Sequence, residues 1–139
     1  MYYSGVFFTG DARNKLLSES KEKLDKIIGD LHVTFYFNPP RELRFPLDII
    51  GEEVTIDVVG EGNDGKNQGF EVEIPDVKIK GKKLQDLYNG AKVPHITLSL
   101  SSEGKAVKTA FLDFKPITPF KVTGKLGYWE SGKLVINKS

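Results

Sequence analysis

The chain has no cysteine among its 139 residues, which excludes disulfide frameworks, zinc sites with cysteine ligands and thiol nucleophiles. It also has no run of about eighteen apolar residues, so we expect no membrane-spanning helix. The N-terminus lacks the basic segment and cleavage site of a secretory signal. Together these absences favour a cytoplasmic protein.

The chain also has almost no net charge, since 20 Lys and Arg stand against 19 Asp and Glu and leave +1. A protein that follows the phosphates of a long nucleic acid usually has a clear basic surplus. If the protein has a nucleic-acid partner, we therefore expect a small nucleotide or a short RNA end rather than a long duplex, and we expect no membrane partner. Length and an ordinary composition indicate one globular domain over residues 1–139.

The pattern of apolar residues is typical of an α+β domain with antiparallel strands. Helical spacing predicts a long helix over residues 12–28 and a short one at 84–88. Asn63-Asp64-Gly65 is a strong turn signal and predicts a hairpin. Aromatic and β-branched composition predicts strands at 2–9, 31–37, 54–59, 69–74, 95–101, 121–126 and 133–136.

The only two histidines stand in the same short motif. His32 is followed two residues later by Thr34, and His95 by Thr97, each within apolar flanks. Side chains alternate along a strand, so each histidine shares a face with its threonine while the neighbouring apolar residues face a core. Two half-buried strands with incidental His-Thr pairs are the alternative. The repetition favours a common site, and we expect the two imidazoles to face each other across one cleft.

Two imidazoles and two hydroxyls suit phosphodiester hydrolysis. Imidazole holds or releases a proton near neutrality, so one histidine can act as base and the other as acid. The threonine hydroxyls can donate to the non-bridging oxygens where charge develops. A zinc site is the alternative, but zinc normally takes three or four ligands and no Asp or Glu shares these faces. The sequence thus predicts catalytic roles for His32, Thr34, His95 and Thr97 with no metal or cofactor.

The paired motifs resemble the signature of the 2H phosphoesterase superfamily. Its members include bacterial RNA 2′,3′-cyclic phosphodiesterases, the cyclic phosphodiesterase domain of fungal tRNA ligases, and phage enzymes that destroy cyclic-oligonucleotide alarm signals (anti-CBASS nucleases). The segment 104–109 is similar to one that follows the second motif in the last two branches. The resemblance implies a two-lobed, pseudo-symmetric α+β fold with central antiparallel strands and flanking helices. It also implies catalytic histidines and phosphate-binding threonines.

The predicted function is a metal-independent phosphodiesterase that hydrolyses cyclic nucleotides or cyclic oligonucleotides. On the phage resemblance, this would be a viral enzyme that degrades immune signals in the host cytoplasm. Two alternatives stay open: an RNA 2′,3′-cyclic phosphodiesterase, and a module that sequesters a nucleotide without turnover. Tyr3, Tyr36 and Trp129 are candidates for stacking on a base, and Lys105 for binding a phosphate. For each of the four, ordinary packing or solvated surface is the alternative.

Overall fold

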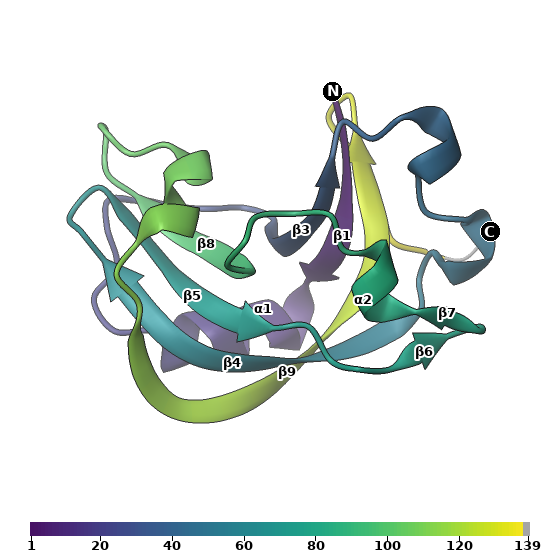
Figure 1. The fold of residues 1–139 in the computed structure, drawn as a ribbon. Helices are drawn as coiled ribbons and strands as arrows, with labels where there is room; N and C mark the ends of the chain where they lie inside the picture. The colour runs from purple at the N-terminus through teal and green to yellow at the C-terminus, as the bar shows by residue number, and fades with distance from the viewer. Residues whose placement is uncertain (138–139) are drawn as a thin grey trace.

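The computed structural model describes residues 1–137 and shows a closed antiparallel barrel of six strands (Figure 1). The barrel strands, in spatial order, are β1 (Tyr2–Phe8), β3 (Leu31–Phe37), β8 (His95–Leu100), β5 (Asn67–Glu73), β4 (Glu53–Asn63) and β9 (Lys115–Glu130), which closes onto β1. The shorter strands are β2 (Lys26–Ile27) on β8, β10 (Lys133–Val135) on β9, and the separate hairpin β6 (Lys78–Ile79) and β7 (Lys82–Lys83).

The closed barrel, built mostly of antiparallel strands, shows that the predicted α+β class and the two-lobed fold with flanking helices are wrong. Helix in residues 1–137 is limited to α1 (Gly10–Glu19), α2 (Leu84–Leu87) and the 3₁₀ turns η1 (Arg41–Leu43), η2 (Leu47–Ile49) and η3 (Ala106–Phe111). The physical reason is the 16-residue strand β9, which pairs first with β4 and then with β1. The sheet therefore closes on itself, and neither of its two edges stays open. The sequence predicted only residues 121–126 of this strand, because Pro116 and Pro119 interrupt the pattern before it.

The helix predicted over residues 12–28 is also wrong in its second half. α1 ends before Ser20, and the chain then lies along β8 through β2. Hydrogen bonds to other elements replace helical ones: the Leu24 amide donates to Ser99 Oγ at 2.9 Å, and the Ile28 amide donates to the Leu98 carbonyl at 2.9 Å. Pairing with the sheet therefore overrides the helical spacing of the apolar residues.

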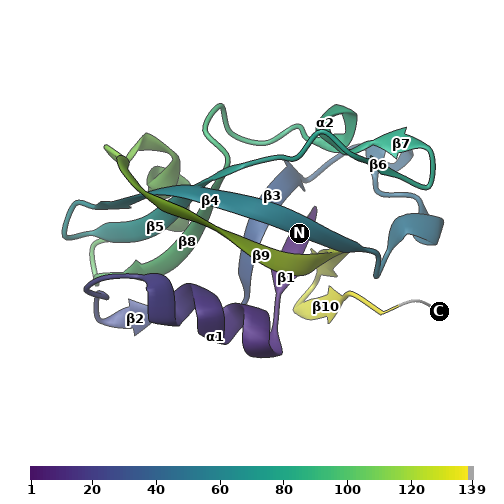
Figure 2. The ribbon, with the colours of Figure 1, turned by 90° about the horizontal axis from the view of Figure 1, so that it is seen from below.

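The barrel interior holds the core. The inward residues of the two motif strands, Val33, Phe35, Ile96 and Leu98, have no exposed surface. Leu16 of α1 joins the same core, and Figure 2 shows α1 and α2 on opposite sides of the barrel. The apolar faces of the motif strands thus pack inside a barrel, and not against the flanking helices that the resemblance implied. No helix within residues 1–137 is long and apolar enough to cross a membrane.

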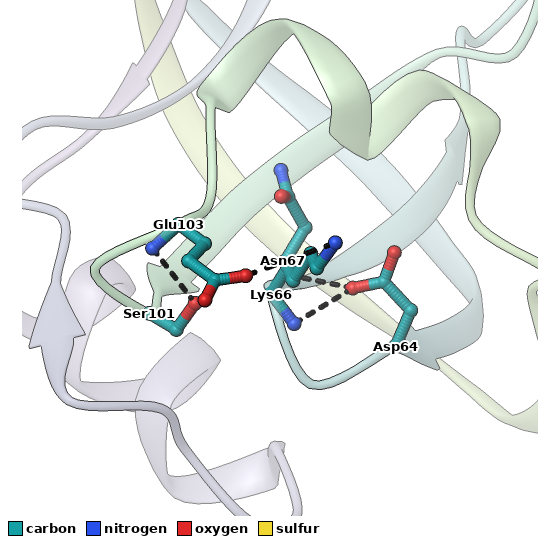
Figure 3. Close-up of polar contacts among 5 residues, drawn as sticks. All are labelled: Asp64, Lys66, Asn67, Ser101 and Glu103. Carbon is teal, nitrogen blue, oxygen red and sulfur yellow. Dashed lines mark hydrogen bonds and ion pairs between the residues drawn. The ribbon is translucent and has the colours of Figure 1, made fainter.

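The predicted hairpin between β4 and β5 is present, with longer strands than the sequence predicted. Its turn is built around Asp64, whose carboxylate accepts hydrogen bonds from the backbone amides of Lys66 at 2.9 Å and Asn67 at 2.7 Å (Figure 3). On the neighbouring loop after β8, the Glu103 amide donates to Ser101 Oγ, and Glu103 forms an ion pair with Lys66 at 3.8 Å. The turn therefore begins β5 at a fixed position beside the end of β8.

Gly5 supplies a direct test of the packing between β1 and β3. A Cβ on this residue would lie 2.0 Å from the Val33 carbonyl oxygen, at the point where the strand register shifts. We expect Gly5→Ala to lower the free energy of unfolding by about 1–3 kcal/mol or more, because the backbones must move apart. Gly29→Ala is the matched control, since nothing lies within 4 Å of its Cβ. Equal urea midpoints for the two variants would contradict the close approach.

Candidate active site

The two His-x-Thr motifs lie on neighbouring antiparallel strands of the barrel, β3 and β8, where Val33 pairs with Ile96. The strands run antiparallel, so the residues next to this pair face each other in turn. His32 lies across from Thr97, and Thr34 lies across from His95. Val33 and Ile96 point into the core, so the four motif side chains point outward. The two histidines are therefore diagonal neighbours in the ladder, a position from which aromatic and long side chains can reach one another.

Both imidazoles are held by the same local hydrogen bond. His32 Nδ1 lies 2.7 Å from the Asp30 carbonyl oxygen, and His95 Nδ1 lies 2.8 Å from the Val93 carbonyl oxygen. A carbonyl oxygen only accepts, so Nδ1 carries the proton in both rings. In the neutral ring Nε2 then has a free lone pair, and in the imidazolium it has a proton to donate. Each histidine is thus oriented by the residue two positions before it and offers Nε2 for chemistry.

Burial lowers the pKa of both histidines below the ordinary value. For His32 the hydrogen bond to the Asp30 carbonyl and the Asp30 charge oppose this effect, while the positive charge of His95 lowers the pKa further. For His95 the hydrogen bond to the Val93 carbonyl is the opposing contribution. Glu71 is the cross-strand neighbour of His95 on β5. The influence of His95 on His32 agrees with their diagonal placement in one site.

A cavity of about 470 Å³ lies over these side chains on the outer surface of β3 and β8. Its walls are Tyr3 from β1, Ile28 from the segment after α1, the loop 89–91 and the outward side of η3. The loop is held against β3 by a 2.7 Å hydrogen bond from the Asn89 amide to the Phe35 carbonyl. The residues that line the cavity are Tyr3, Ile28, His32, Thr34, Tyr36, Phe37, Asn89, Gly90, Ala91, His95, Thr97, Ala106, Val107 and Ala110.

One wall of the cavity is aromatic. The Tyr3 ring stacks on His32 with centroids 4.9 Å apart, and on Trp129 at 5.6 Å. Phe37 on β3 is a cross-strand neighbour of Tyr3, with ring centroids 6.5 Å apart. The Phe37 side chain is 57% exposed. Phe7 stacks on His32 at 5.2 Å. The imidazole of His32 is therefore held by two aromatic rings as well as by its hydrogen bond.

The four predicted substrate-binding residues lie at different places. Tyr3 and Tyr36 line the cavity. Trp129 does not line it and instead supports Tyr3 from β9. Lys105 is exposed and does not line the cavity. Its backbone carbonyl oxygen accepts a hydrogen bond from the Asn67 side chain. Burial raises the pKa of Tyr3 to about 12, so its hydroxyl keeps its proton and remains a donor.

Several residues of the site gave no usable signal in the sequence. Asn89 follows the short helix predicted at 84–88 and carried no predicted role, yet it contributes to the cavity wall. Asn67 and Thr109 are buried polar residues beside Thr97, and they come from a hairpin and a 3₁₀ turn that are far apart in the chain. The similarity of segment 104–109 to other proteins pointed to this region without assigning a role to Thr109.

No three His, Cys, Asp or Glu side chains gather as a metal-ligand set within residues 1–137. Scans of the sequence against protein-family models and curated proteins, and a search of solved structures, find no match.

The histidine environment makes a prediction for NMR titration of the free protein. We expect both imidazoles to titrate below the ordinary 6.5, with Nδ1 as the protonated nitrogen in the neutral rings. His95→Asn should raise the pKa of His32, because it removes a neighbouring positive charge. Lys92→Ala, which changes an exposed residue outside the cavity lining, is the control. A pKa for His32 above 6.5, or one that His95→Asn leaves unmoved, contradicts the shared site.

Proposed function

We propose that this protein is a phosphodiesterase that hydrolyses small cyclic nucleotides or cyclic oligonucleotides with two histidines and no metal. The observation that carries the proposal is the arrangement of the two motifs. Neighbouring strands set two imidazoles and two threonine side chains around one cavity, with Nε2 of each ring available. Paired titratable groups on either side of one phosphate are what acid/base hydrolysis needs, whereas binding alone does not need them.

The proposed reaction is a displacement by water at phosphorus. One neutral imidazole takes a proton from the water as its oxygen bonds to phosphorus, and the other imidazolium gives a proton to the ester oxygen as its bond to phosphorus breaks. The products are a phosphate monoester and an alcohol. Thr34 and Thr97 lie across the ladder from the two histidines, where their hydroxyls can donate to the non-bridging oxygens.

The lining of the cavity supports a diester with an attached base as the substrate class. None of its lining residues in the described part of the chain is Asp, Glu, Lys or Arg. A diester carries one negative charge, which a single imidazolium and two hydroxyls can balance, whereas a terminal monoester or polyphosphate carries more. The aromatic wall contains Tyr3 and the exposed Phe37, against which a nucleobase can pack. A volume of about 470 Å³ lies in the range of small-molecule sites.

The direct test is turnover of a substrate panel in excess EDTA. The panel consists of cyclic dinucleotides, cyclic trinucleotides, nucleoside 2′,3′-cyclic phosphates and short RNAs with cyclic phosphate ends. We expect turnover of a cyclic nucleotide, and His32→Ala or His95→Ala should lower kcat by about 10²–10⁴-fold, because each removes a proton-transfer group.

Lys92→Ala is the control for these histidine variants, and all are checked for matched urea unfolding. Faster turnover of short RNAs with cyclic phosphate ends would favour the alternative of an RNA 2′,3′-cyclic phosphodiesterase. Tight nucleotide binding by a wild-type protein that turns over nothing would favour a sequestering module. Turnover that survives in the double His32→Ala, His95→Ala variant would place the chemistry elsewhere.

The lowered histidine pKa values make a prediction for the pH profile. The value of kcat/KM depends on the free protein, and the reactive form has one histidine neutral and one protonated. Since burial holds both pKa values below 6.5, that form is most abundant on the acidic side of 6.5. We expect a bell-shaped kcat/KM with its maximum there, and a kcat profile moved to higher pH because the bound phosphate raises both pKa values. A kcat/KM maximum on the alkaline side of 6.5 would contradict this account.

A further inference from the structure

The two threonines of the site differ in their surroundings. Within residues 1–137, the Thr34 hydroxyl makes no hydrogen bond, whereas Thr97 Oγ1 lies 2.9 Å from Thr109 Oγ1 and 3.4 Å from the Ala106 carbonyl oxygen. Thr109 belongs to η3 and has no exposed surface. The second motif therefore has a buried hydroxyl behind it, which the first motif lacks.

Thr109 is in turn held by Asn67 at the start of β5. Asn67 Nδ2 lies 2.9 Å from Thr109 Oγ1 and 2.6 Å from the Lys105 carbonyl oxygen. A carbonyl oxygen only accepts, so the NH₂ group must be on this side and the orientation of the amide is determined. Asn67 therefore donates to Thr109. With one lone pair of Thr109 engaged in this way, its own proton can be directed toward Thr97.

From these contacts we infer that Asn67 and Thr109 position the Thr97 hydroxyl as a donor to the substrate phosphate; this inference rests on the proposed function. In the free protein Thr97 donates to Thr109. When a phosphate occupies the cavity, both hydroxyls rotate, so that Thr97 donates to a phosphoryl oxygen and accepts from Thr109. All donors then run in one direction, from the Asn67 amide through Thr109 and Thr97 to the phosphate. Bonds ordered in this way strengthen one another in a buried site.

The chain of hydrogen bonds is built into the fold. Asn67 is 1% exposed, and its backbone amide is fixed by the carboxylate of Asp64. In Figure 3 the Asn67 side chain points away from that turn. Gly69 is the β5 residue across from Thr97, and a Cβ there would lie 2.7 Å from the Thr109 methyl group and 2.4 Å from the Ile96 carbonyl oxygen. Glycine at this position therefore lets η3 approach the strand closely enough for Thr109 to reach Thr97.

The asymmetry has a consequence for the reaction. Thr97 exchanges one hydrogen bond for another when the phosphate binds, and it keeps its link to Thr109 throughout. Its hydroxyl is therefore oriented before the transition state forms, which is the condition for effective stabilisation of developing charge. Thr34 has no such partner in residues 1–137 and must be oriented by the substrate itself. Asn67 and Thr109 are positioning residues, since they act through Thr97.

The test is a double-mutant cycle measured on the panel diester that the wild-type protein hydrolyses. Thr109→Val removes the hydroxyl with little change of shape, and Thr109→Ser retains it. We expect Thr109→Val to lower kcat by about tenfold with little change in KM, and Thr109→Ser to restore most of the rate. In the Thr97→Val background, Thr109→Val should have no further effect, because the hydroxyl that it orients is already gone.

Lys108→Ala, an exposed neighbour on η3, is the control, and Thr109→Ala replaces Thr109→Val if the latter does not fold. If Thr109→Val lowers kcat equally in the wild-type protein and in the Thr97→Val variant, or if Thr109→Ser is as slow as Thr109→Val, the inference is overturned while the proposed function stays intact. A wild-type protein without turnover overturns both.

Discussion

The pairing of β3 with β8 is the constraint on which the rest of the site depends. One antiparallel contact, Val33 with Ile96, sends the apolar side chains of both strands into the barrel and the His-x-Thr side chains out of it. A slip of one residue on either strand would bury a histidine and expose a core residue. Barrel closure protects against that slip, because β1 holds β3 from its other edge and β5 holds β8. The core and the candidate site are therefore specified by the same register.

The outer surface of the two strands becomes a cavity because three irregular segments cover it. The chain after α1, the loop at Asn89 and the turn η3 each lie against this surface, and each is fixed by backbone hydrogen bonds or by buried polar side chains. Together they bury the two histidines in a partly apolar environment, and this burial lowers both pKa values even though the Asp30 charge opposes it at His32. Enclosure thus lowers the pKa of both histidines and leaves, among the described residues, a cavity lined without Asp, Glu, Lys or Arg.

Much of the site could be predicted from the sequence, and much of the architecture could not. Strand periodicity predicted which residues share a face, because alternation depends only on local backbone geometry. Closure of the barrel depends on β9 pairing with both β4 and β1, a long-range event that Pro116 and Pro119 conceal. The end of α1 at Ser20 is likewise set by pairing with β8. Asn67 and Thr109 escaped prediction because their roles arise only where a hairpin and a 3₁₀ turn meet. The two motifs resemble those of the 2H phosphoesterases, but the two-lobed fold that this resemblance implied is not the fold of this chain.

The central claim is that the two imidazoles share one phosphate. NMR titration of both rings, with and without a slowly hydrolysed phosphorothioate analogue of the diester that turns over, tests it most directly. A phosphate bound between them places its negative charge beside both rings, so the pKa values of His32 and His95 should rise together. A rise at only one histidine, or at neither while the analogue is bound, would contradict the account.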